Sequence, residues 1–103
     1  MTKVDIKIPK RRESSIEKEF NRKFKEEFPQ YKQVKMNIQG RRGWPDRMIL
    51  GPNQYVVFIE FKRDDSSELS MSQTDMFKWL HGACFSAIVC VSAEEALNYL
   101  RKS

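Results

Sequence analysis

The chain has 103 residues, 40% of them hydrophobic and 32% charged, with 19 Lys and Arg against 14 Asp and Glu and a formal net charge of +5. These values exclude a membrane protein and predict one domain with a small core, which a partner subunit would help to complete. The charge is uneven, because residues 1–42 hold 13 basic and 6 acidic residues whereas residues 43–103 hold 6 and 8. The excess of basic residues in residues 1–42 favours a polyanionic partner, although a solvated lysine-rich helix would give the same excess.

Residues 1–13 are predicted to form a basic N-terminal arm, in which Val4, Ile6 and Ile8 alternate with polar residues as in a strand. No apolar run reaches the 18–20 residues that span a bilayer, and the N-terminus lacks the apolar stretch of a signal peptide. We therefore expect a cytoplasmic protein with no membrane partner.

A helix is predicted to begin at Ser14, because Ser14 and Glu17 have the spacing of a capping box, and to stop at Pro29. An apolar residue recurs every four positions within it, which places a single stripe on one side of the helix. The stripe consists of Ile16, Phe20, Phe24 and Phe28. We assign this stripe to the core.

Three strands are predicted next. Val34, Met36 and Ile38 alternate with polar residues, as in a half-buried strand. A turn over residues 40–45 leads to a short strand at 46–50, and a second turn leads to a strand at 55–62 that is rich in β-branched and aromatic residues.

A polar loop over 63–69 precedes a second helix, capped by Ser70 and Gln73 at its start and by Gly82 at its end. Residues 85–91 are predicted to form a strand buried on both faces, and Ser92 caps a last helix that runs through Leu100. The order helix, three strands, helix, strand, helix predicts an α/β fold with a mixed sheet of about four strands.

Both cysteines, Cys84 and Cys90, are predicted to lie in one strand, about 20 Å apart if it is fully extended. A disulfide needs Cα atoms within about 7 Å. We therefore predict two buried thiols without an intrachain bridge, in a reducing compartment.

Glu60 and Lys62 share one face of the strand at 55–62, about 6.6 Å apart and flanked by apolar residues. Burying such charges is costly unless they are paired or bind a metal. A three-residue loop at 52–54 would place Asp46 directly opposite Glu60, where two carboxylates repel each other. A hard divalent cation such as Mg²⁺ would relieve that repulsion, whereas a single histidine and two cysteines cannot build an ordinary zinc site.

Two further residues have two interpretations each. Glu17 lies on the apolar side of its helix and could reach the metal directly or through water, but the capping box alone would explain it. Gln73 has the same ambiguity at the start of the next helix.

These residues resemble the PD-(D/E)XK nucleases, and within them the virus-type replication-repair nuclease (VRR-NUC) domain. The resemblance rests on Glu17 in a first helix, the run from Gly43 to Asp46, the run from Ile59 to Lys62, and Gln73 after Leu69 and Ser70. It covers about residues 14–100, so the nuclease domain is expected to span 14–103, in the manner of stand-alone phage and bacterial members.

The resemblance implies a restriction-endonuclease-like core and hydrolysis of DNA phosphodiesters with Mg²⁺, for which Mn²⁺ can substitute. Asp46 and Glu60 would bind the metal together with the backbone carbonyl of Phe61, Lys62 would be the catalytic lysine, and Glu17 and Gln73 would be accessory site residues. Stand-alone members act as homodimers on branched DNA, including four-way (Holliday) junctions, which implies a role in recombination or DNA repair.

Basic residues in the arm and near the site are expected to contact DNA phosphates without reading sequence. They are Lys3, Lys7, Lys10, Arg11, Arg12, Arg41, Arg42, Arg47 and Arg63. Trp44 could stack on an unpaired base or pack within its turn. Trp79 is predicted to lie in the core or on a dimer surface, and His81 to be a polar residue at a helix end. A flap or single-strand nuclease and a DNA-binding module that does not cut remain alternatives.

Overall fold

The computed structural model describes residues 14–36, 42–64 and 68–103, so the predicted basic arm lies outside the described residues. The order of helices and strands is the predicted one. The elements are α1 (Ser15–Glu27), β1 (Lys32–Lys35), β2 (Arg47–Gly51), β3 (Tyr55–Phe61), α2 (Met71–Gly82), β4 (Ser86–Cys90) and α3 (Ala93–Lys102). Among the described residues, no helix is long and apolar enough to cross a membrane.

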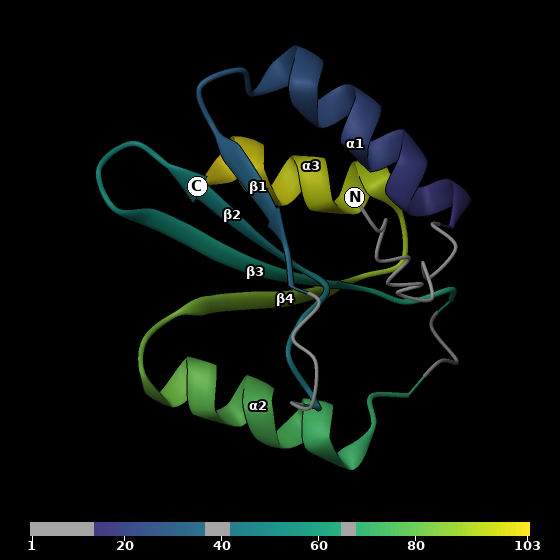
Figure 1. The fold of residues 1–103 in the computed structure, drawn as a ribbon, viewed down its shortest axis with the longest axis vertical. Helices are drawn as coiled ribbons and strands as arrows, with labels where there is room; N and C mark the ends of the chain where they lie inside the picture. Colours follow the sequence, from purple (N-terminus) through teal and green to yellow (C-terminus); the bar gives the residue numbers. More distant parts are fainter. Residues whose placement is uncertain (1–13, 37–41, 65–67) are drawn as a thin grey trace, which may run out of the picture.

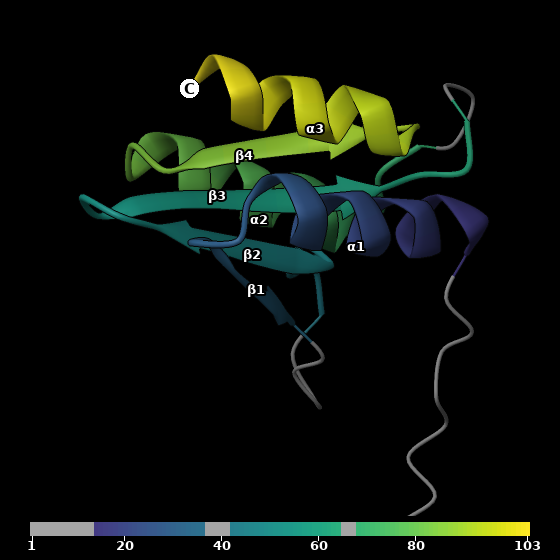
Figure 2. The ribbon, with the colours of Figure 1, turned by 90° about the horizontal axis from the view of Figure 1, so that it is seen from above.

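The four strands form one mixed sheet in the order β1-β2-β3-β4, in which β4 runs parallel to β3 and the other pairs are antiparallel. Helices α1 and α3 cover one face of the sheet and α2 covers the other (Figures 1 and 2). The chain therefore forms three layers, and the predicted mixed α/β sheet is confirmed.

The hairpin between β2 and β3 has the predicted register. Arg47 pairs with Ile59 and Gly51 pairs with Tyr55, so that three residues form the loop between the strands. Two of these, Asn53 and Gln54, adopt left-handed backbone conformations with φ of 59° and 62°. The antiparallel register continues one step past the end of β2, which puts Asp46 beside Glu60.

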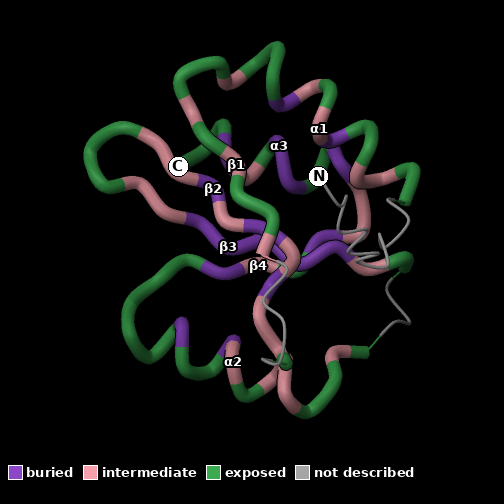
Figure 3. Tube along the Cα trace, viewed as in Figure 1, coloured by how far each residue is buried: buried purple, intermediate pink, exposed green. Residues whose placement is uncertain are grey.

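The two faces of the sheet have separate cores, and buried residues concentrate in the central strands (Figure 3). Val57, Ile59 and Phe61 of β3 face α1 and α3, while Phe58 packs beneath α2. Both faces of β3 are thus covered, which is why this strand reads as a nearly continuous apolar run. The predicted phenylalanine stripe is confirmed, because Phe20 and Phe24 are buried in the α1 core.

The two outer strands are more exposed than predicted. Val34 of β1 remains 40% exposed, and β4, predicted to be buried on both faces, exposes Ser86 and Val89. Both strands lie at an edge of the sheet. An edge strand lacks a neighbouring strand on one side and is therefore more exposed. The hydrophobic run of β4 does not reveal that the strand lies at an edge.

The end of α2 also differs from prediction. The helix includes Gly82, and the left-handed residue that follows it is Cys84, with φ of 66°. The Cys84 N–H donates to the His81 carbonyl and the Phe85 N–H donates to the Leu80 carbonyl, which is the Schellman pattern. The prediction of Gly82 as the cap was therefore two residues early.

This turn corrects the interpretation of the cysteines as well. Cys84 lies in the turn rather than in a strand and is exposed, whereas Cys90 is buried at the end of β4. Both thiols are free, as predicted. Burial raises the pKa of the Cys90 thiol to about 12, so this cysteine stays protonated and unreactive near neutral pH.

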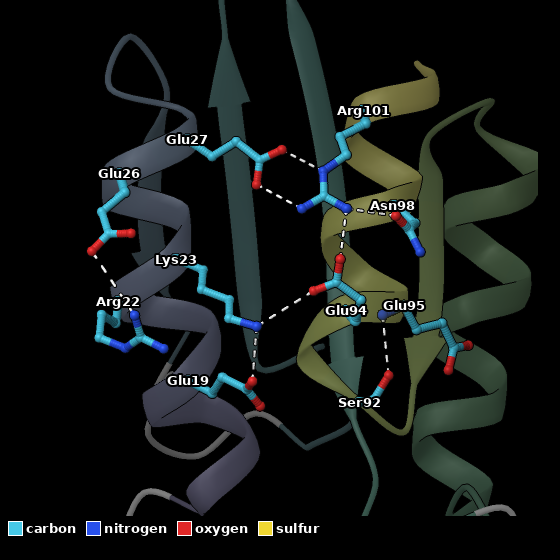
Figure 4. A network of polar contacts seen from close by, with 10 residues as sticks. All are labelled: Glu19, Arg22, Lys23, Glu26, Glu27, Ser92, Glu94, Glu95, Asn98 and Arg101. Atoms are coloured by element: carbon cyan, nitrogen blue, oxygen red, sulfur yellow. Dashed lines mark hydrogen bonds and ion pairs between the residues drawn. The ribbon is translucent and has the colours of Figure 1, made fainter.

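Helices α1 and α3 are joined by a network of ion pairs (Figure 4). Arg101 of α3 bonds Glu27 of α1 and Glu94 of its own helix, and Lys23 of α1 lies 2.9 Å from Glu19 and 3.5 Å from Glu94. Hydrogen bonds from Arg101 lower the pKa of both Glu27 and Glu94. These side chains are solvent-accessible, so the network adds only modestly to the stability set by the core.

We predict that Arg101→Met lowers the melting temperature by a few degrees at pH 7 and low salt. The difference should shrink near 1 M salt, where exposed charges are screened. Because the pKa of Glu27 and Glu94 is lowered in the folded state, the contribution of the ion pairs to stability is present above the ordinary carboxyl range. It is lost as the pH falls through the lowered pKa values.

Thermal melts over a pH and salt series test this prediction, with Arg22→Met as the control. Among the described residues, Arg22 pairs only with Glu26 of its own helix, at 3.9 Å. An unchanged difference at high salt would contradict the electrostatic explanation.

Candidate nuclease site

Asp46 and Glu60 meet where β2 begins and β3 ends. The Asp46 backbone N–H donates to Glu60 Oε1 at 3.1 Å, and the Phe61 N–H donates to Asp46 Oδ2 at 3.0 Å. Each carboxylate is thus oriented by the backbone beside the other, and Glu60 is only 2% exposed. The two acids therefore lie beside each other, as the predicted hairpin register requires.

Lys62 and Gln73 complete the group around Glu60. Lys62 Nζ lies 3.6 Å from Glu60 Oε2 and donates to Gln73 Oε1 at 3.0 Å. Gln73 Nε2 in turn donates to Glu60 Oε2 at 3.2 Å. The carboxylate, the ammonium group and the amide form a closed triangle, so the charge of the buried acid is compensated and the lysine is held in place.

The two interpretations of Gln73 turn out to be compatible. Its side-chain oxygen accepts from the Ser70 N–H at 2.9 Å, and its own N–H donates to Ser70 Oγ, so the capping box is complete. The same amide side chain also contacts Glu60 and Lys62. The start of α2 is therefore tied directly to Glu60 of β3 and to Lys62, which follows that strand.

The turn before Asp46 packs closely against α2. Gly43 has φ of +93°, and a Cβ added there would lie 2.3 Å from the Ser72 carbonyl oxygen. Only glycine fits this approach without displacement of the backbone. The next residue, Trp44, is half-buried and packs on Phe58 with ring centroids 6.4 Å apart, which favours its packing role over base stacking.

Arg47 lies on the opposite face of the sheet from Glu60 and is buried, with 1% exposed. Its guanidinium donates to Glu17 Oε2 at 2.8 Å and to the side chains of Asn21 and Gln33. It also lies 5.8 Å and 5.4 Å from the ring centroids of Phe20 and Phe61. The prediction of Arg47 as a DNA contact was therefore wrong. Side chains alternate between faces along a strand, so the residue after Asp46 points into the core beneath α1.

Glu17 is the partner of this arginine. The Ser14 hydroxyl caps α1 by accepting from the Glu17 N–H at 3.2 Å, while the Glu17 carboxylate pairs with Arg47. Within the described ranges, no three acidic, histidine or cysteine side chains gather closely enough to hold a metal, so Glu17 does not join Asp46 and Glu60 in one cluster. It does line a pocket of about 410 Å³ together with Phe61, Lys62 and Arg63.

The other predicted site residues are distributed as follows. Arg42 and Arg63 are exposed near the site, whereas the basic residues of the arm and Arg41 lie outside the described residues. Trp79 is 61% exposed, which excludes the core and leaves the surface interpretation. His81 is a polar helix-end residue as predicted, with Nε2 2.8 Å from the Ala87 carbonyl oxygen.

The carboxylate oxygens of Asp46 and Glu60 are suitable ligands for a hard divalent cation. Two carboxylates on neighbouring strands, next to the backbone of Phe61, offer oxygen ligands of the kind that Mg²⁺ prefers. Two carboxylates are also the usual protein contribution to such a site, since waters and a substrate phosphate supply the remaining ligands. The residues present therefore fit the metal implied by the sequence resemblance.

We predict that Arg47→Met destabilises the protein by about 3 kcal/mol, because it leaves the carboxylate of Glu17 in a largely buried position without its cation. Urea unfolding measures this loss. The double variant Arg47→Met/Glu17→Gln removes the stranded charge and should be less destabilised than the sum of the two single variants. A loss below about 0.5 kcal/mol for Arg47→Met would show that the pair does not stabilise the fold.

Comparison with known proteins supports the fold. No family model matches the sequence, and no curated protein matches it. A solved structure described as a VRR_NUC domain matches with a TM-score of 0.70 and 20% sequence identity, over 85% of this chain and 97% of that one. The chain therefore has the restriction-endonuclease-like fold of a VRR-NUC domain, as the resemblance in its sequence implied.

Proposed function

We propose that the protein is a metal-dependent endonuclease that hydrolyses phosphodiester bonds in DNA. The observation that carries this proposal is the linked group of Asp46, Glu60, Lys62 and Gln73 on a VRR-NUC fold. A protein that only bound DNA would gain nothing from two carboxylates facing phosphate. The group is chemically complete for phosphodiester hydrolysis once a divalent cation is added.

Asp46, Glu60 and the backbone carbonyl of Phe61 would hold Mg²⁺, with Mn²⁺ as a substitute. When bound, the cation would polarise the phosphate and lower the pKa of a bound water. The chain itself supplies orientation, because the carboxylates of Asp46 and Glu60 are fixed by backbone N–H groups before any substrate arrives. Such preorganisation avoids the cost of rearranging these groups during the reaction.

Lys62 would orient the attacking water or neutralise the charge that develops on the phosphate. Gln73 prepares it for this role, since its amide oxygen accepts from the ammonium group while its amide nitrogen holds Glu60. The lysine side chain is 17% exposed, so a substrate phosphate can still reach it from solvent.

We predict that Asp46→Asn abolishes cleavage while largely preserving DNA binding, because it removes a metal ligand and no basic residue. Labelled junction, flap and duplex DNA incubated with Mg²⁺ or Mn²⁺ provide the assay, and a gel shift measures binding. Asp75→Asn, which alters an exposed acid on α2, is the matched control and should cut normally. Equal loss of binding and cleavage would contradict the metal role. Salt-sensitive binding by a folded wild-type protein that cuts none of these substrates would instead indicate a DNA-binding module.

We further propose that the preferred substrate is branched DNA, resolved as a four-way junction by a homodimer of this chain, with flap or single-stranded DNA as the alternative. The VRR-NUC resemblance and the small size of the domain support this. Apolar side chains also remain on the surface of α2 and β4, with Trp79 61% exposed and Val89 36% exposed. A symmetric pair of sites suits a symmetric junction.

A homodimer should sediment at twice the chain mass of 12.2 kDa and make paired, symmetric cuts across a four-way junction. If Trp79 lies in the interface, Trp79→Ala should shift the protein toward the monomer and lose paired cutting. Met71→Ala, which alters an apolar side chain of α2 that is 84% exposed, is the control. Analytical ultracentrifugation and product mapping decide the question. A wild-type monomer that cuts flaps better than junctions would reject the junction proposal.

A further inference from the structure

We propose that the side of α1 turned away from α3 binds the phosphate backbone of the duplex leading away from the cleavage site. Its contacts would be Lys18, Arg22 and Lys25, called here the α1 basic stripe. This inference rests on the proposed function, since it concerns the DNA that the nuclease would hold. It concerns residues that the sequence patterns did not single out.

The two sides of α1 differ in how their charges are compensated. On the side that faces α3, Lys23 is paired with Glu19 and Glu94 (Figure 4). On the other side, no carboxylate within the described part of the chain forms an ion pair with Lys18 or Lys25. The same helix therefore carries one neutralised side and one side with uncompensated positive charge.

Arg22, the middle member of the stripe, is only weakly engaged. It lies 3.9 Å from Glu26, and both side chains are more than 60% exposed, at 63% and 69%. Figure 4 shows both residues on the side of α1 away from α3. A contact of this length between exposed groups is easily exchanged for a contact with phosphate. Together with Asn21 and Glu26, the stripe lines a surface hollow of about 490 Å³.

The spacing of the stripe suits a nucleic-acid backbone. Positions 18, 22 and 25 follow the i, i+4, i+7 pattern that keeps side chains on one side of a helix. They extend over about 10 Å of the helix axis. One strand of B-DNA presents a phosphate about every 3.4 Å along its axis, so the stripe matches a segment of about three phosphates.

The stripe also begins next to the part of α1 that lies beside Lys62. The first turn of α1, from Ser14 to Glu17, lines the same pocket as Phe61, Lys62 and Arg63. Lys18 is the next residue, and Lys25 lies about two turns farther along the helix. Figures 1 and 2 both place the start of α1 beside the end of β3. A strand whose phosphate lies at Lys62 can therefore continue along the stripe.

The test compares two double variants that each remove two positive charges. Lys18→Ala/Lys25→Ala removes the uncompensated members of the stripe, whereas Lys78→Ala/Lys102→Ala removes exposed lysines of α2 and α3. Binding to a fluorescent four-way junction is measured by anisotropy in Ca²⁺, over a series of salt concentrations. We expect the stripe variant to lower the slope of log K against log salt by about two, since each phosphate contact contributes about 0.9. The control should keep the wild-type slope.

A third variant, Lys23→Ala, removes a lysine from the same helix on the side that faces α3 and should also leave the slope unchanged. If the stripe variant and the controls change the slope equally, the effect is one of net charge and the proposal is overturned. That outcome leaves the nuclease function intact, because metal-dependent cleavage by the wild-type protein is measured separately. Conversely, the stripe variant could lower the salt slope as expected while the wild-type protein cuts no DNA. That result would reject the proposed nuclease function and support the binding surface.

Discussion

The arrangement of the site depends on one buried cation, Arg47. Its guanidinium connects Glu17 of α1 to Gln33 of β1 and is enclosed by the rings of Phe20 and Phe61. A buried ion pair is a poor source of net stability compared with apolar packing, but breaking one is costly. Its consequence here is geometric, because it fixes the first residue of β2 against two other elements. Asp46, the residue before it, is held in position by the same backbone.

Because side chains alternate between the two faces of a strand, the core residues and the proposed catalytic residues lie on opposite faces of the sheet. The face beneath α1 and α3 receives Arg47 and the larger apolar core, while the other face receives Glu60 and Lys62 next to the start of α2. Gln73 of the α2 capping box connects this helix to Glu60 at the end of β3 and to Lys62 just after it. A residue that caps the start of a helix thus also orients the proposed catalytic lysine.

The sequence was sufficient wherever a local rule determines geometry. Loop length fixed the register that joins Asp46 to Glu60, and the capping residues Ser14 and Ser70 marked the helix starts. It was insufficient where tertiary context decides. The exposure of β4 follows from its place at the sheet edge, and the left-handed role of Cys84 would ordinarily belong to a glycine. The burial of Arg47 could have been inferred from alternation, since Asp46 already occupied the other face.

The charge asymmetry of the sequence also takes on a physical meaning in three dimensions. Glu94 of α3 pairs with Lys23 of α1, so it neutralises charge that belongs to the basic N-terminal part of the sequence, residues 1–42. Among the described residues of α1, Lys18 and Lys25 have no such partner, and they lie on the opposite side of the helix. Ion pairing between helices therefore does more than join them, because it selects which side of α1 presents positive potential. A polyanion approaching that side would meet the stripe, which begins one residue after the segment of α1 that lines the pocket at Lys62.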